Sequence, residues 1–296
     1  MKPPAFEYFR PASVDEALGL LAGQSGAKPL AGGQSLIPAM NFRLAAPEVL
    51  VDLNGIASLR GITRLASGAL RLGAMTRHHE IETSPDVAAH APLLAETMPH
   101  IAHPAIRNRG TVGGSLAHAD PAAELPAVMV ALQATLVLTS RSGERRVTAP
   151  EFFTGLFSTA LDVGELLTAI ELPPPPPRSG SAFLELARRH GDYALVGVAV
   201  TVTLDPSGQC DTARIALFSV GDGPVLAQRV AVALEGLRPD ADVIAAAADA
   251  VQDDIDPPTD IHASAAYRRR LARVLTGRAL ERAFDRARRG PSNPET

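Results

Sequence analysis

Two glycine-rich segments contain the residue types that can hold an anion through the main chain. The first is Ala31-Gly32-Gly33-Gln34-Ser35-Leu36, and the second is Thr111-Val112-Gly113-Gly114-Ser115. Glycine has no Cβ, so backbone N–H groups can converge on a phosphate, and the serine and threonine hydroxyls add further donors. Either segment alone is explained at least as well by a plain turn. Two of them in one part of the chain suggest a diphosphate held between two loops by neutral donors.

The sequence lacks the motifs of several other kinds of functional site. Neither of the two lysines, Lys2 and Lys28, follows a glycine as a Walker A loop demands, and no G-x-G-x-x-G motif opens a Rossmann unit. Ile37 occupies the place of the last glycine in a nucleophile elbow. The 8 histidines form no H-E-x-x-H motif, so we expect no metal site. The single cysteine, Cys210, allows neither a disulfide within the chain nor a cluster held by this chain alone, and we interpret it as a small buried hydrophobe.

Composition narrows the class of protein further. The 28 basic and 32 acidic residues give a net charge of −4, which argues against a protein that coats nucleic-acid phosphates. No apolar run approaches the roughly 20 residues of a membrane-spanning helix. The single cysteine fits a reducing compartment, and the N-terminus does not read as a signal peptide. We therefore expect a soluble, cytoplasmic protein.

Two further positions could contact a ligand. Residues 188–194 lie between two strand-like runs, and Tyr193 beside the bend at Gly191 could present an aromatic face to a planar group. The alternative is an ordinary turn. Asp120 precedes Pro121, where it could cap a helix running toward Leu132, or contact a ribose or a ring edge.

The elements that must position these residues fall on either side of five consecutive prolines, 173–177, which favour an extended linker. Before the linker the pattern mixes helices and strands, beginning with a capping box at Ser13 and Glu16. After it, strand-like runs are followed by helical stretches, which indicates an α+β arrangement. The expected strands before the linker are 49–53, 59–64, 69–73, 135–138, 145–148 and 166–172; after it, strands 183–187, 195–204 and 212–220 precede helices 226–234, 241–254 and 263–289.

Charge is unevenly distributed in the last third of the chain. Residues 267–289 hold nine arginines, whereas residues 239–256 hold six aspartates and no basic residue. The simplest interpretation is a basic helix lying near an acidic one, and a partner-binding role is the alternative. We expect the stripe of Tyr267, Leu271, Val274 and Leu275 to pack inside its own domain.

The two glycine segments and residues 188–194, which we call the tyrosine loop, occur in the same order in the FAD-binding medium subunit of the molybdenum hydroxylases. The chain thus resembles this family, which includes xanthine dehydrogenase and aerobic carbon monoxide dehydrogenase. The resemblance extends to about residue 289. Its motifs are F-x-Y-x-R-P (6–11), A-G-G-Q-S-L-I-P (31–38), G-A-M-T-R-H (73–78), I-R-N-R-G-T-V-G-G-S (106–115), A-D-P-A-A-E (119–124) and G-D-Y-A (191–194).

This resemblance implies a fold and a set of cofactor contacts. The fold would be α+β: a two-part, vanillyl-alcohol-oxidase-like (PCMH-type) FAD-binding domain at residues 1–176, and a C-terminal domain at 177–290 with a three-stranded antiparallel sheet and a helical bundle. A disordered tail would follow at 291–296. The two glycine loops would hold the FAD pyrophosphate, and Tyr193 would lie beside the isoalloxazine. The implied FAD contacts are Ala31, Gly32, Gly33, Gln34, Ser35, Leu36, Ala102, Thr111, Gly113, Gly114, Ser115, Asp120, Glu124, Leu167 and Tyr193.

The resemblance also implies how the protein works. FAD would accept electrons from iron–sulfur clusters and pass them to an external acceptor, and no catalytic side chain is needed in this chain. An iron–sulfur small subunit and a molybdopterin large subunit would be its partners, assembled as a dimer of heterotrimers. Residues 116–160 contain no cysteine, unlike relatives with an inserted cluster loop, and Glu185 stands where the family often has lysine. The alternatives are a self-contained FAD oxidase of the vanillyl-alcohol-oxidase class and a non-enzymatic scaffold.

Overall fold

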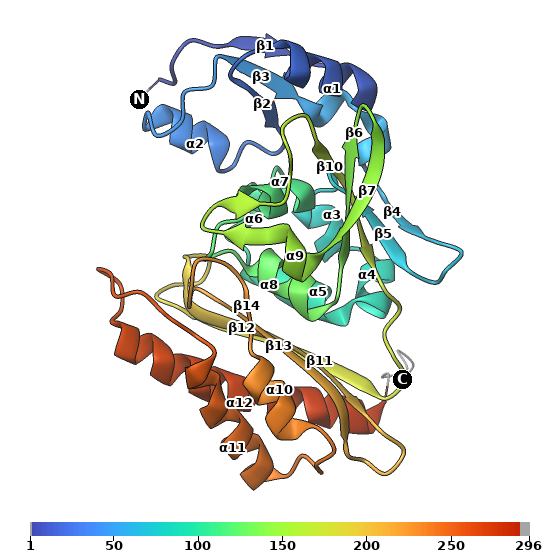
Figure 1. The fold of residues 1–296 in the computed structure, drawn as a ribbon, viewed down its shortest axis with the longest axis vertical. Helices are drawn as coiled ribbons and strands as arrows, with labels where there is room; N and C mark the ends of the chain where they lie inside the picture. Colours follow the sequence, from blue (N-terminus) through green and yellow to red (C-terminus); the bar gives the residue numbers. More distant parts are fainter. Residues whose placement is uncertain (1, 291–296) are drawn as a thin grey trace.

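A small parallel sheet begins the chain in the computed structural model, which describes residues 2–290 (Figure 1). Its strand order is β1-β3-β2, and the strands are β1 (Glu7–Phe9), β2 (Ala27–Leu30) and β3 (Val49–Asp52). Helix α1 (Val14–Gly23) begins at Ser13, whose hydroxyl accepts a hydrogen bond from the Glu16 amide (3.2 Å), as the capping box predicts. Ala17 and Leu18 of α1 join the buried strand β3 in one core cluster. Helix α2 (Leu36–Asn41) follows the first glycine segment.

The second layer is a five-stranded antiparallel sheet of order β4-β5-β10-β6-β7. Its strands are β4 (Ile62–Arg64), β5 (Leu70–Gly73), β6 (Thr135–Ser140), β7 (Gly143–Thr148) and β10 (Leu166–Leu172). A two-stranded ribbon, β8 (Phe153–Gly155) and β9 (Ser158–Thr159), pairs separately. The helices of this part are α3 (His78–Glu82), α4 (Pro85–His90), α5 (Pro92–Thr97), α6 (Pro104–Arg107), α7 (Val112–His118), α8 (Glu124–Ala131) and α9 (Ala149–Phe152).

The start of α8 differs from the sequence prediction. The helix expected from Pro121 begins only at Glu124. The Asp120 carboxylate accepts a hydrogen bond from the Ala122 amide (2.9 Å) and so closes a turn before the helix instead of capping it.

The C-terminal sheet has four strands, not the three expected. The three long strands are antiparallel, and a two-residue strand, β14, pairs with the outer one. Two residues are too few to show an alternating pattern, and the helix expected from residue 226 begins only at Gln228. The strands are β11 (Ser179–Ala187), β12 (Ala194–Leu204), β13 (Cys210–Phe218) and β14 (Val225–Leu226); the helices are α10 (Gln228–Leu234), α11 (Ala241–Ala250) and α12 (Ala265–Arg289).

Both faces of this sheet are covered, so it connects the two halves of the chain. Figure 1 shows the sheet lying between α10, α11 and α12 on one side and the helices around α5 and α8 on the other. Alternate residues of β12 serve the two cores: Val198 and Val200 pack with the C-terminal helices, whereas Ala199 packs with the core of the preceding layer. Phe183 and Phe218 also belong to the core of the preceding layer, where they stack with ring centroids 5.9 Å apart. The C-terminal sheet therefore completes the hydrophobic core of the part that precedes the proline segment.

Helix α12 lies beside the acidic segment, as the charge pattern predicts. Arg273 pairs with Asp249 of α11, and Arg269 lies 3.5 Å from Asp256. The predicted packing stripe is only partly correct: Leu275 is buried, but Tyr267 and Val274 are 45% and 37% exposed.

Candidate functional site

The first glycine segment forms a loop whose amides point to no protein acceptor. It joins β2 to α2, and Gly33 adopts a left-handed conformation (φ +73°) that favours glycine. Within residues 2–290, no atom accepts a hydrogen bond from the N–H groups of Gly32, Gly33, Gln34 or Ser35. Four successive unpaired donors form a concave main-chain surface suited to an anion.

The second glycine segment uses its amides differently. Thr111 caps α7, and its hydroxyl accepts from the Gly114 amide (3.1 Å). The Val112 and Gly113 amides donate to the carbonyls of Thr76 (3.1 Å) and Ala74 (2.8 Å). A Cβ on Gly113 would lie 2.5 Å from the Ala74 Cβ, so this glycine permits close packing of α7 on the end of β5. The hydroxyls of Thr111 and Ser115 are the donors that this loop can offer a ligand.

The fold brings the two predicted glycine loops into contact. A Cβ on Gly114 would lie 3.1 Å from the Cβ of Ala31, and a Cβ on Gly32 would lie 2.9 Å from the Cα of Gly110 and still closer to the Arg109 carbonyl oxygen. The approach is close enough that only glycine fits at position 32. The unpaired amides of the first loop therefore lie at the junction with the second, as a diphosphate between two loops requires.

A polar network behind the loops was missed by sequence reasoning. Arg77 donates to the carbonyl of Arg109 and to the side-chain oxygen of Asn54, and the Asn54 side-chain amide donates to the Ala31 carbonyl (2.9 Å). Asp52 accepts from the Asn54 main-chain amide (2.9 Å). Arg77 belongs to the motif at residues 73–78, which could have marked it as a functional residue. Nothing in the sequence, however, indicates that it lies beside residue 109.

The tyrosine loop packs on a second group of predicted residues. Gly191 has φ +83°, and a Cβ there would lie 2.8 Å from the Ala102 carbonyl oxygen, so the loop rests on Ala102 and its neighbour His103. Tyr193 is 69% exposed, which leaves its ring open to a ligand. Partial desolvation, and then the carboxylates of Asp120 and Glu124, raise the pKa of Tyr193 above its ordinary value. Ala102, Asp120, Glu124 and Tyr193 thus form one group.

A buried acid cluster continues from this group toward the C-terminal sheet. Burial, and then the neighbouring Glu185 and Asp120, raise the pKa of Glu124 to about 7. The Glu185 carboxylate lies 3.4 Å from His100 Nδ1, and this contact raises the pKa of His100. The second Glu185 oxygen is buried without a partner among residues 2–290. Position 185, for which the resemblance led us to expect lysine, is therefore a glutamate paired with a histidine.

Leu167, the last predicted contact, lies next to the second glycine loop. Its side chain is buried in the core on β10, and its neighbour Thr168 accepts from the Ala74 amide (3.0 Å). Ala74 is the residue whose carbonyl binds the Gly113 amide.

Other potential sites in the described part of the chain do not form a reactive centre. No cluster of three or more His, Cys, Asp or Glu there could hold a metal ion, and no helix there is long and apolar enough to cross a bilayer. Cys210 is buried, as predicted, and burial raises the pKa of its thiol to about 11, which keeps it unreactive.

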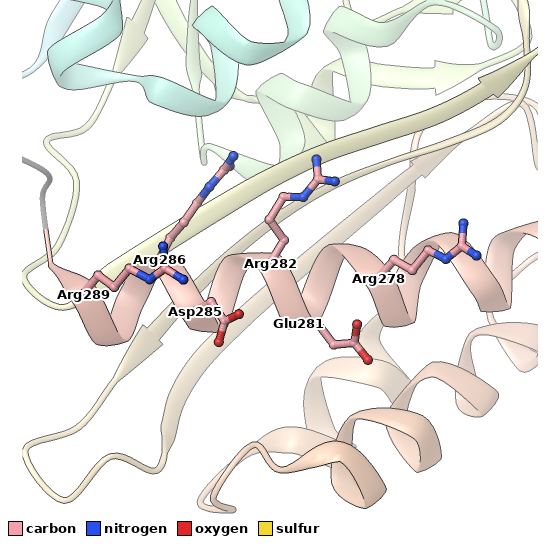
Figure 2. A pocket seen from close by; sticks show the side chains of 6 residues that line it. All are labelled: Arg278, Glu281, Arg282, Asp285, Arg286 and Arg289. Atoms are coloured by element: carbon pink, nitrogen blue, oxygen red, sulfur yellow. The ribbon is translucent and has the colours of Figure 1, made fainter.

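The depression on α12 is lined by charged side chains, three of which pair with residues outside the lining. Figure 2 shows Arg282 and Arg286 extending from the helix, and both reach Glu96 of α5, at 3.6 and 2.6 Å. Asp285 pairs with Arg288 (2.9 Å). The two contacts with Glu96 tie α12 to the preceding layer, which is a structural role. The residues that line the depression are Arg278, Glu281, Arg282, Asp285, Arg286 and Arg289.

Comparison with known proteins covers nearly the whole chain. The family described as the FAD binding domain in molybdopterin dehydrogenase matches residues 4–175, and the CO dehydrogenase flavoprotein C-terminal domain matches residues 181–283. The 6-hydroxypseudooxynicotine dehydrogenase complex subunit alpha of Paenarthrobacter nicotinovorans is 44% identical, over 97% of each chain. The carbon monoxide dehydrogenase medium chain of Afipia carboxidovorans is 42% identical, over 97% of this chain and 100% of the relative. A chain in the crystal structure of quinoline 2-oxidoreductase from Pseudomonas putida 86 superposes with a TM-score of 0.92 at 42% identity, covering 96% of this chain and 99% of the other.

Proposed function

Because the chain belongs to the FAD-binding medium subunits of the molybdenum hydroxylases, we propose that it carries electrons from iron–sulfur clusters of a partner subunit, through FAD, to an external acceptor. It is an oxidoreductase component, and its cofactor is FAD. Family membership favours this reading over a self-contained oxidase.

The contact between the two glycine loops carries the proposal for the site. Four unpaired amides, residues 32–35, stand where the loops meet, and a diphosphate supplies the acceptors that they lack. In this arrangement the Thr111 and Ser115 hydroxyls donate from the second loop. The diphosphate thereby anchors one part of the cofactor while leaving the ring to other residues.

The tyrosine loop is our candidate for the ring end. Tyr193 lies with Ala102, Asp120 and Glu124 at the contact between the C-terminal sheet and the preceding layer. Its exposed ring can lie against one face of the isoalloxazine and limit the access of oxygen and water to it. The flavin itself supplies the redox chemistry, since no side chain of this chain must act as a general base.

The assembly proposed for this chain follows from its lack of cluster ligands. A single, buried cysteine cannot hold an iron–sulfur cluster, and family membership leads us to assign the clusters to a small partner subunit and molybdopterin to a large one. We place them in a dimer of heterotrimers in the cytoplasm, with the chain divided into domains at residues 176 and 177. The relatives are named for different substrates (6-hydroxypseudooxynicotine, carbon monoxide and quinoline), which fits a substrate pocket on another subunit.

Purification of the chain alone and with its partners tests the proposal. We expect one FAD per chain, no iron or molybdenum, and no oxidation of an organic substrate until the partners are added. Turnover of an organic substrate by the chain alone at an ordinary enzymatic rate would favour the self-contained oxidase, and a colourless chain that cannot be reconstituted with FAD would favour a scaffold.

A further inference from the structure

The orientation of the first glycine loop is set by one side chain behind it. Asn54 lies in the short turn after β3, and its amide nitrogen donates to the Ala31 carbonyl (2.9 Å). In a planar trans peptide the carbonyl and the following N–H point in opposite directions. The Gly32 N–H therefore points away from Asn54, and it is the first of the four unpaired amides.

Arg77 connects this arrangement to the second loop. One guanidinium nitrogen donates to the Arg109 carbonyl and another to the Asn54 side-chain oxygen. The Arg109 carbonyl is the atom against which Gly32 packs most closely. One planar guanidinium thus holds both sides of the junction between the loops, which a single ammonium group on a lysine could not do with the same geometry.

Asn54 is itself held in a single orientation. Asp52 accepts from its main-chain amide (2.9 Å) and from its side-chain nitrogen, and Arg60 donates to its carbonyl (3.0 Å). Burial alone would raise the pKa of Asp52, but hydrogen bonds from Tyr8 and Asn54 lower it below the ordinary value, so Asp52 stays ionised as an acceptor. The side-chain oxygen of Asn54 is then left to face Arg77.

The charges around Arg77 indicate that an anion belongs at this junction. Burial, and then the neighbouring Arg60 and Arg109, lower the pKa of the Arg77 guanidinium, while Glu80 and Asp52 act in the opposite direction. Three guanidinium groups thus stand against two carboxylates, and the net positive charge of this group favours a bound anion.

We propose that Arg77, oriented by Asn54, is a positioning residue for the diphosphate of FAD. It holds the two glycine loops together and keeps the amides of residues 32–35 directed at the phosphates, and its charge adds to the attraction. The inference rests on the proposed function, because it assigns the diphosphate as the anion.

FAD titration of the flavin-depleted, full-length chain tests this assignment. We expect Arg77→Met to weaken FAD binding by about 10- to 100-fold, the range for loss of a charged hydrogen-bonding group. Arg77→Lys, which retains charge but not both contacts, should give an intermediate loss. Asn54→Asp keeps an acceptor for Arg77 but loses the donor to Ala31, and it should also weaken binding. Arg64→Met removes a charge of the same kind from a surface pair with Asp86 (3.1 Å) and should leave the affinity unchanged.

Three measurements separate positioning from a general structural role. The visible spectrum of the flavin bound to Arg77→Met should stay that of the wild type. The salt dependence of FAD binding should become less steep when the charge is removed. The Asn54→Asp and Arg77→Met losses should be strongly non-additive in the double variant, because one side chain orients the other.

The outcomes distinguish this inference from the function on which it rests. If wild-type chain fails to bind FAD, the proposed function fails. If wild-type chain binds FAD and both Arg77→Met and Arg77→Lys bind it equally well, the function stands and the positioning role is wrong. If Arg77→Met does not fold, Arg77→Lys and Asn54→Asp decide the matter by the same titration.

Discussion

Replacing Gly32 by alanine perturbs the proposed FAD site at the point where the two loops touch. The added methyl group would lie 2.9 Å from the Gly110 Cα and closer still to the Arg109 carbonyl oxygen, whereas ordinary contacts of this kind begin at 3.4 Å. Both neighbours are backbone atoms, so no flexible side chain can turn away. The loops must move apart by about 1 Å to restore ordinary contacts.

That displacement sets the expected magnitude. Overpacking of this kind costs about 1–3 kcal/mol of folding stability. A shift of about 1 Å also misdirects the first of the unpaired amides of residues 32–35, so that it no longer points at the phosphate. Loss of one or two charged hydrogen bonds then lowers FAD affinity by about 10- to 100-fold.

The assay is thermal unfolding of the flavin-free chain together with FAD titration. Gly19→Ala is the matched control, because Gly19 lies inside α1 with no atom within 4 Å of an added Cβ. It should leave FAD binding unchanged and stabilise the helix by about 0.5–1 kcal/mol. Wild-type FAD affinity in Gly32→Ala would refute the contact between the loops as the basis of binding.

Three further predictions concern the ligand contacts and the acid cluster. Gly33→Asp and Gly114→Asp should each give folded protein without flavin, because a carboxylate repels the diphosphate; stoichiometric FAD after purification of both variants would contradict the assignment. Tyr193→Ala should keep FAD while changing its absorbance spectrum or its reoxidation by oxygen, and unchanged spectra and kinetics would show that the ring faces elsewhere. The folded-state pKa of Glu124, about 7, lies above its ordinary value of 4.5, so between these pH values the folded chain binds more protons than the unfolded chain. Its unfolding free energy should therefore fall as the pH rises from 4.5 to 7, by on the order of 3 kcal/mol. The unfolding free energy, measured with denaturant from pH 5 to 8, should depend less steeply on pH in Glu124→Gln than in the wild type. An equal dependence on pH in the two proteins would count against a buried, uncharged Glu124.

The glycine loops could be predicted from the sequence because their chemistry is local. One pair of glycines with adjacent hydroxyl residues fits a plain turn equally well, and only the presence of two such segments indicates a larger ligand. The strand at Leu166–Leu172 could likewise be predicted from a mainly apolar run that ends at the proline segment.

The residues that support the loops could not be predicted because their contacts are distant in sequence. Asn54 binds a carbonyl 23 residues away, and Arg77 binds one 32 residues away. Neither pairing leaves a periodic pattern. The late start of α8 has a different, local cause: Asp120 closes a turn with Ala122, and this turn competes with the helix cap that its residue type favours.

Electron transfer between this chain and its iron–sulfur partner is the most direct test of the central claim. The partner subunit is reduced chemically without oxygen and mixed with the FAD-loaded chain in a stopped-flow spectrometer. The proposed relay predicts that the visible absorbance of the flavin is lost as the clusters become oxidised, and that an organic substrate added to the chain alone leaves the flavin oxidised. Clusters that stay reduced beside an oxidised flavin, or bleaching of the flavin by substrate in the absence of partners, would contradict it.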